Sequence, residues 1–262
     1  MSLSLHIGAT GMLAQQTNVD VISNNIANMT TTGFKRQRAQ FHDLLYQNIE
    51  RPGATSSDAG TVVPSGIQLG LGVKTGAVHR LHSQGSLATT ENPFDLAILG
   101  EGYFEIQLPD GDTAYSRDGS FQINGDGALV TAQGYIVQPA ITVPDNAKDV
   151  VINASGEVLA SIDGQADLSN LGQLQLTIFP NKAGLEAVGE NLYLETTASG
   201  SPVVGNPAED SYGRIEQGML ENANVNSVEE ITNLIAAQRA YEFNSQTVQV
   251  SDRMLEAAAN LR

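Results

Sequence analysis

The sequence predicts a mainly β protein with a long α-helix at each end, on two observations. Apolar residues recur every seven positions near both termini, which is the spacing of helices that pack against other helices. Between the termini, apolar and polar residues alternate, and this alternation is interrupted by the Asp-Gly and Asn-Gly dipeptides that hairpin turns prefer. We therefore expect an antiparallel β central domain, with helices contributed only by the termini.

The first helix is expected within residues 1–30. Its seven-residue repeat consists of Leu5, Met12, Val19 and Ile26, interleaved with Gly8, Gln15, Ile22 and Met29. Asp20 is the only formally charged side chain in this segment. Gly33 can adopt the left-handed conformation that closes a helix, so the helix should end between Asn28 and Gly33.

The second helix is expected within residues 225–262. Ser227 and Glu230 fit a capping box, in which the Ser227 hydroxyl accepts from the third helical N–H and Glu230 reaches back to the cap. No Gly or Pro follows before Leu261, and about 35 residues at about 1.5 Å each make a rod of roughly 50 Å. The repeat consists of Leu234, Tyr241, Val248 and Leu255, interleaved with Ile231, Gln238, Ser245 and Asp252.

Residues 77–224 are expected to form the antiparallel β domain. Apolar and polar residues alternate from Phe104 to Val143, and the same pattern returns in GQLQLTIFPN and GENLYLET. Hairpin turns are expected at Asp110-Gly111, Asp118-Gly119, Asn124-Gly125 and Asp126-Gly127.

Residues 31–76 are expected to be an extended connector with an insertion at 47–76. This insertion is rich in Gly, Ser, Thr and Pro, and a loop of such length with weak internal structure is usually disordered or functional. Its apolar residues favour ordering against a partner; they are Val62, Val63, Ile67, Leu69 and Leu71.

Charge separates the ends of the chain from its middle. Of the formal net charge of -16, residues 1–30 carry -1 and residues 225–262 carry -2, which leaves -13 on residues 31–224. The ends are therefore suited to burial and the middle to water. The acidic balance argues against nucleic acid and acidic membrane surfaces as partners, because both need clustered Lys and Arg.

The sequence also predicts neither membrane insertion nor a cleaved signal peptide. No stretch approaches 18 uninterrupted apolar residues, the length of a membrane-spanning helix. The first residues lack the basic region and the apolar run of a secretory signal. Export of this chain would therefore need another route.

We predict no catalytic residue, no cofactor and no metal site. The chain has no cysteine, which removes disulfides, thiolate ligands and cysteine nucleophiles together. His79 and His82 are spaced as two metal ligands on a helix could be, but no further ligands follow, so ordinary surface histidines are favoured. The remote alternative from another class is an exported glycan hydrolase that uses acids such as Asp110, Asp112 and Asp118.

The segment ANMTTTGFKR resembles the signature of the bacterial flagellar rod and hook protein family. The residues that carry the motif are Ala27, Asn28, Thr30, Gly33, Phe34 and Lys35. Four further segments are similar to the family and follow in its order: residues 92–106, 114–135, 189–196 and 238–256. Within the family, the length and the insertion from Leu44 to Lys74 are most similar to distal rod subunits, with a proximal rod or hook-type subunit as the alternative.

The resemblance implies a structural subunit rather than an enzyme. It implies head-to-tail helical polymerisation into a hollow shaft that crosses the periplasm and transmits motor torque to the hook, after export through the flagellar type III apparatus. The implied partners are copies of the chain, other rod proteins, the hook protein and envelope ring proteins. In the family, the terminal helices pair as a coiled coil lining the inner tube, and the β domain faces outward.

We expect the terminal helices to fold only on assembly. Their thin apolar seams bury too little surface to offset about 1–2 kcal/mol of backbone entropy per residue, so neighbouring copies would have to supply the core, including that of the signature segment. The residues expected to hold the inner coil are Leu5, Met12, Val19, Ile22, Ile26, Ile231, Leu234, Tyr241, Val248 and Leu255.

Overall fold

The computed structural model describes residues 3–51, 65–162 and 167–260. It is mostly β, with one long helix near each terminus and antiparallel sheets between them, which confirms the predicted fold class. The chain forms two compact units. We call Met1–Ile26, Gln37–His79 and Asn226–Arg262 the terminal unit, and Ala27–Arg36 and Arg80–Val225 the β body.

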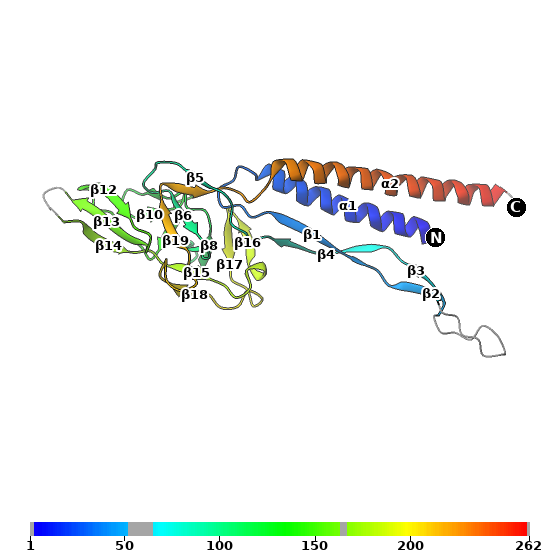
Figure 1. The fold of residues 1–262 in the computed structure, drawn as a ribbon, viewed down its shortest axis with the longest axis horizontal. Helices are drawn as coiled ribbons and strands as arrows, with labels where there is room; N and C mark the ends of the chain where they lie inside the picture. Colours follow the sequence, from blue (N-terminus) through cyan, green and yellow to red (C-terminus); the bar gives the residue numbers. More distant parts are fainter. Residues whose placement is uncertain (1–2, 52–64, 163–166, 261–262) are drawn as a thin grey trace. The chain divides into compact units, whose positions relative to one another are not determined.

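Helices α1 (Leu3–Ala27) and α2 (Ser227–Asn260) lie side by side in the terminal unit (Figure 1). Asn25 near the end of α1 bonds Glu230 near the start of α2, whereas Gly8 lies against Val248. The helices therefore run antiparallel, and α1 ends one residue before the expected range.

The cap of α2 is Asn226, not Ser227. The Asn226 Oδ1 accepts from the backbone N–H groups of Val228 (3.1 Å) and Glu229 (3.4 Å), as an N-cap side chain does. Ser227 is already the first helical residue, and the Glu230 carboxylate accepts from the Asn25 side chain. The predicted capping box is therefore wrong, because its Glu is used between the helices.

Four strands complete the terminal unit: β1 (Gln37–Asp43), β2 (Tyr46–Glu50), β3 (Ile67–Gly70) and β4 (Val73–Arg80). β1 pairs with β4, and β2 pairs antiparallel with β3 with Tyr46 opposite Gly70. The described parts of residues 47–76 are thus paired strands rather than the weakly structured loop expected. Val62 and Val63 lie outside the described residues.

The β body holds the remaining strands: β5 (Leu87–Thr89), β6 (Leu96–Leu99), β7 (Phe104–Gln107), β8 (Thr113–Ser116), β9 (Gln122–Ile123), β10 (Leu129–Val130), β11 (Ile136–Gln138), β12 (Ala147–Ile152), β13 (Glu157–Ile162), β14 (Ser169–Gln173), β15 (Leu176–Ile178), β16 (Glu186–Gly189), β17 (Leu192–Leu194), β18 (Val203–Gly205), β19 (Arg214–Gln217) and β20 (Met219–Glu221). Its largest sheet has the order β16-β17-β8-β7-β11-β10-β9, and β12-β13-β14 form a second sheet. Three strand pairs, β15-β18, β19-β6 and β20-β5, complete it.

Three of the four dipeptides expected in hairpin turns lie in two such turns, with Asn124-Gly125 and Asp126-Gly127 in the same one, and the fourth dipeptide has another role. Gly111 turns the chain between β7 and β8, and Gly127 turns it between β9 and β10, both at positive φ. Gly119 does not make a hairpin: its carbonyl accepts from the Leu96 N–H, and a side chain there would collide with the Leu96 carbonyl. This glycine is needed for close backbone approach.

Buried side chains from these strands and their connections form the core of the β body. Its main cluster contains buried aliphatic and aromatic side chains, with Phe104 and Phe121 edge to face at 5.0 Å between ring centroids. A second, aromatic cluster gathers Tyr103, Tyr115, Phe179, Leu185 and Tyr193. The β body thus has a core of its own.

Candidate assembly surfaces

Small and polar residues line the contact between α1 and α2. On α2 the contact line repeats every seven residues through Glu230, Ala237, Asn244 and Ser251, of which all but Asn244 are fully buried. A Cβ atom on Gly8 would lie 2.7 Å from Val248 Cγ2, and one on Gly11 would lie 2.8 Å from Asn244 Oδ1. The helices therefore approach closely, and bulky residues remain at the sides.

The residues predicted to hold the inner coil lie in three environments. Ile22 is buried. Six are half-buried: Leu5, Met12, Val19, Ile26, Leu234 and Val248. Three are exposed: Ile231, Tyr241 and Leu255. The observed contact line of α2 lies one residue before the interleaved positions Ile231, Gln238, Ser245 and Asp252. The role of the ten predicted inner-coil residues in a polymer stays a prediction.

Replacing Gly11 with leucine is expected to destabilise the helix pair by about 1–3 kcal/mol, the usual cost of overpacking. The added side chain would collide with Asn244 and force the helices apart. Thermal unfolding followed by far-ultraviolet circular dichroism measures this change. Ala9→Leu is the matched control, since Ala9 is exposed on the same helix. Equal melting shifts in the two variants would contradict the close contact.

Asn25 joins α1, α2 and β1 within the terminal unit. Its Oδ1 accepts from the Gln37 N–H at 2.8 Å, and its Nδ2 donates to the Gln37 carbonyl at 2.8 Å and to Glu230 Oε2 at 3.2 Å. Asn25 and Glu230 are both fully buried. The amide thus pairs with the Gln37 backbone as a neighbouring strand would, a role that the sequence analysis missed.

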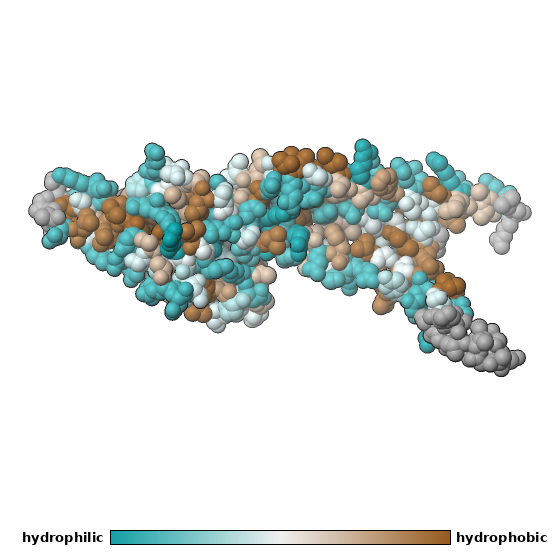
Figure 2. Space-filling view, viewed as in Figure 1, coloured by the Kyte–Doolittle hydropathy of each residue, from teal (hydrophilic) through white to brown (hydrophobic). Residues whose placement is uncertain are grey.

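Two rows of exposed apolar side chains lie on the sides of α2, off its contact line with α1. Val228, Ile231 and Ile235 form one row, and Phe243, Val250 and Met254 form the other. Figure 2 shows the first row as an apolar patch over the N-terminal half of α2, and a second patch along β2 and β3. Contiguous exposed apolar patches of this kind mark interaction surfaces.

The signature segment is built into the β body. Gly33 has φ of +69°, its N–H donates to the Glu221 carbonyl at 2.7 Å, and a Cβ there would lie 2.7 Å from the Asp118 nitrogen. The Thr31 N–H donates to the Asn28 carbonyl at 3.1 Å, which turns the chain before it. Of the other motif residues, Asn28 and Phe34 are half-buried, Ala27 and Thr30 are exposed, and Lys35 is buried.

Lys35 enters a buried cluster of three charges. Its Nζ donates to Glu221 Oε1 at 2.7 Å and to the Ser83 carbonyl at 2.9 Å. Arg117 Nη1 lies 3.4 Å from Glu221 Oε2, and Arg117 Nη2 donates to the Gly100 carbonyl at 2.6 Å. Burial lowers the pKa of the Lys35 ammonium, against the attraction of Glu221. The expectation that this segment lacks a core within one chain is therefore wrong.

His82 is not the surface histidine expected. It is half-buried, and its Nδ1 lies 2.8 Å from the Tyr103 hydroxyl. Burial, followed by the positive charges of Lys35, Lys182, Arg80 and Arg117, lowers the pKa of its imidazole from 6.5 to about 4. A neutral Nδ1 can accept from Tyr103, whereas protonation removes that acceptor.

The stability of the β body is expected to fall as the pH falls from about 6.5 to about 4. In that window the unfolded chain binds a proton at His82 that the folded chain does not, so acid favours unfolding. Urea unfolding at a series of pH values measures this loss. His82→Asn should flatten the dependence in the same window, and an unchanged slope would contradict the assignment.

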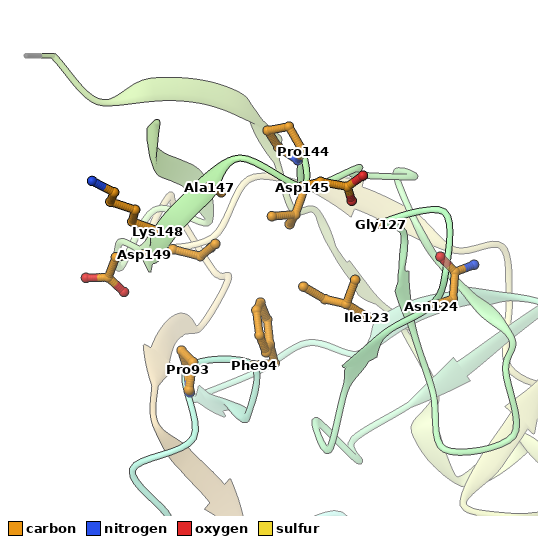
Figure 3. A pocket seen from close by; sticks show the side chains of 12 residues that line it. Pro93, Phe94, Ile123, Asn124, Gly127, Pro144, Asp145, Ala147, Lys148 and Asp149 are labelled. Carbon is orange, nitrogen blue, oxygen red and sulfur yellow. The ribbon is translucent and has the colours of Figure 1, made fainter. Parts of the chain in front are cut away.

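The described residues contain no recognisable catalytic constellation. Asp110 and Asp112 are exposed on the turn between β7 and β8, and Asp118 Oδ1 accepts from the Ser120 N–H and hydroxyl. A cleft of about 310 Å³ lies beside β12, with the side chains of Phe94 and Ile123 facing into it (Figure 3). Across residues 3–51, 65–162 and 167–260, no group of three or more His, Asp or Glu side chains is placed to hold a metal ion.

Comparison with protein families places the chain among the flagellar rod and hook proteins. A "Flagella basal body rod protein" model matches residues 5–35, a "Flagellar hook protein FlgE/F/G D1 domain" model matches residues 97–160, and a "Flagellar basal body rod FlgEFG protein C-terminal" model matches residues 216–261. These matches include the motif residues of the signature segment, strands β7 to β11 of the large sheet, and α2. They define the class of protein as an axial component of the flagellum.

Similar proteins identify the family within that class. The chain is 54% identical to the flagellar basal-body rod protein FlgG of Caulobacter vibrioides over 99% of both chains. It is 51% identical to FlgG of Agrobacterium fabrum over 96% of both, and 45% identical to FlgG of Borreliella burgdorferi over 100% of this chain and 99% of that one. The chain belongs to the FlgG family of flagellar basal-body rod proteins.

Family membership makes the chain a structural subunit of the flagellar rod, and this function is favoured over the hook-type and hydrolase alternatives. It implies a location in the flagellum and assembly with other flagellar components. Neither α1 nor α2, as far as the described residues extend, is long and apolar enough to cross a membrane.

Proposed function

We propose that the chain forms the distal rod by head-to-tail helical polymerisation into a hollow shaft that transmits motor torque to the hook. The observation that carries this proposal is α2, whose two exposed apolar rows lie on the sides left free by α1. A helix with exposed apolar residues on more than one of its sides is suited to contact with protein on each of those sides. Identical subunits joined by a contact that does not close into a ring form an open helix.

In this proposal α1 and α2 line the inner tube and the β body faces outward. The charge distribution supports it, because most of the net charge of -16 falls on residues 31–224. The proposed partners are other copies of the chain, other rod proteins, the hook protein and the envelope ring proteins. The proposed export route is the flagellar type III apparatus, without a cleaved signal peptide.

The β2–β3 ribbon (residues 46–50 and 67–70) is proposed to lie on adjacent subunits and to stiffen the shaft. Four apolar side chains of the ribbon are exposed: Tyr46, Ile49, Ile67 and Leu69. Leu45, which precedes the ribbon, is exposed as well. An isolated two-stranded ribbon is marginally stable in water, so contact with a neighbour would order it. Of the residues between its strands, 52–64 lie outside the described residues.

Deleting residues 45–71 and joining Leu44 to Gly72 is expected to give curved or flexible filaments where the full chain gives straight ones. The Leu44 N–H donates to the Gly72 carbonyl at 2.8 Å, so the ends to be joined already lie together. A deletion of 47–76 would instead remove half of β4. Filament curvature is measured by electron microscopy. Equal straightness would count against the ribbon, and a full chain that forms no filament would count against the proposed function.

A further inference from the structure

A groove runs along α1 on the side turned away from α2. It is a cavity of about 570 Å³ between α1 and the chain around β4. Its apolar lining comes from Leu13, Ala14, Leu44 and Val73, and Asp20 lies among the α1 residues that line it. β4 is held against the helix at Thr10, whose Oγ1 accepts from the Val73 N–H at 3.4 Å. Leu13 is 65% exposed although it lines this cavity, so none of the residues that the structure describes fills the groove.

The second apolar row of α2 has the form of a helix face that enters such a groove. Phe243, Val250 and Met254 are spaced by seven and four residues, which places them on one face. Phe243 and Val250 each precede a residue of the α1 contact line, so this row lies about 100° around α2 from that line. The row and the groove therefore cannot meet within one chain.

The lengths and the charges of the two surfaces agree. From His6 to Asp20 the groove follows 14 residues of α1, or about 21 Å, and from Phe243 to Met254 the row follows 11 residues of α2, or about 17 Å, so the row fits within the groove. Arg239 lies one turn before Phe243 on the solvent side of α2, where it pairs with the exposed Glu242. It offers a cation to Asp20 when the two helices run antiparallel.

From these features we infer that the groove on α1 receives the Phe243, Val250 and Met254 row of a second copy of the chain. The contact joins two different surfaces, so it leaves a free groove on one copy and a free row on the other, and growth continues. This inference rests on the proposed function and names the contact through which it works. Arg239 of the incoming copy then lies near Asp20. Val250 lies about one turn beyond Leu13, because 11 residues separate Arg239 from Val250 and seven separate Asp20 from Leu13.

Cysteine cross-linking tests the contact, since the chain has no native cysteine. A Leu13→Cys chain is mixed with a Val250→Cys chain that carries a size tag, polymerised, and treated with a short bismaleimide. The expected result is a cross-linked heterodimer that exceeds the product with Ile235→Cys several-fold. Ile235 is the matched control, because it is 54% exposed and Val250 is 52% exposed on the same helix.

Charge reversal gives a second readout in the full chain. Asp20→Arg is expected to lower the polymer yield, and adding Arg239→Asp is expected to restore it. Filaments in which Ile235→Cys cross-links as well as Val250→Cys, or a double variant no better than Asp20→Arg, would overturn the contact while leaving the proposed function intact. Failure of the unmodified chain to polymerise would overturn both.

Discussion

Replacing Glu221 with glutamine is expected to lower the free energy of unfolding of the β body by about 3–5 kcal/mol. Glu221 is the single anion between the Lys35 ammonium and the Arg117 guanidinium, and all three side chains are buried. Its Oε1 also accepts from the Gly85 N–H at 2.8 Å. Glutamine keeps the volume of the side chain but leaves the Lys35 and Arg117 cations buried without a counter-charge. Burial of an unpaired charge costs free energy, and this cost destabilises the fold.

The two cations should respond unequally to removal. Lys35→Met leaves Arg117 and Glu221 as a neutral pair, so its loss should be smaller than that of Glu221→Gln. Urea unfolding followed by near-ultraviolet circular dichroism reports on the β body, which holds five of the seven tyrosines. Glu242→Gln, which breaks the exposed pair with Arg239, is the control and should cost under about 1 kcal/mol. Similar losses for Glu221→Gln and Glu242→Gln would refute a buried, coupled cluster.

Local patterns predicted the type and the place of most elements. The apolar repeats at the two termini gave both helices, because a helix places residues seven apart on one face. The Asp110-Gly111 dipeptide gave the β7–β8 hairpin, because its turn needs positive φ. These features depend on residues near one another in the chain, and one sequence contains that information.

The details of packing could not be predicted in the same way. Lys35 and Glu221 are 186 positions apart, and nothing in a single sequence pairs them. Asn226 and Ser227 are both good caps, and the choice depends on Glu230 being engaged by Asn25 from α1. Large apolar residues define the heptad repeat that predicted the helix, whereas the actual contact line of α2 consists mostly of small or polar ones. A repeat of Ala237, Asn244 and Ser251 was the available signal.

Residues 27–225 alone are expected to keep the β body folded and to lose polymerisation entirely. This fragment retains every residue of the β body, including the signature segment, and lacks α2 and nearly all of α1. Without the helices, neither the apolar rows of α2 nor the groove on α1 exists, so no surface remains for the proposed inner tube. Electron microscopy at high protein concentration measures filament formation, and near-ultraviolet circular dichroism measures the fold. Filaments formed by this fragment would refute the assembly role of the helices.

A fragment that begins ten residues later separates the two roles of the N-terminal region. Residues 37–225 lack Gly33 and Lys35, so the Glu221 carbonyl loses its bond from the Gly33 N–H and the Glu221 carboxylate loses its 2.7 Å ion pair. This fragment should unfold at lower urea than 27–225, and by more than Lys35→Met does in the full chain, because the backbone contacts of the signature segment are lost as well. Equal stability of the two fragments would assign the segment to the polymer rather than to the β body. A lower stability of 37–225 would mean that the signature segment completes the β body of each subunit before any neighbour arrives.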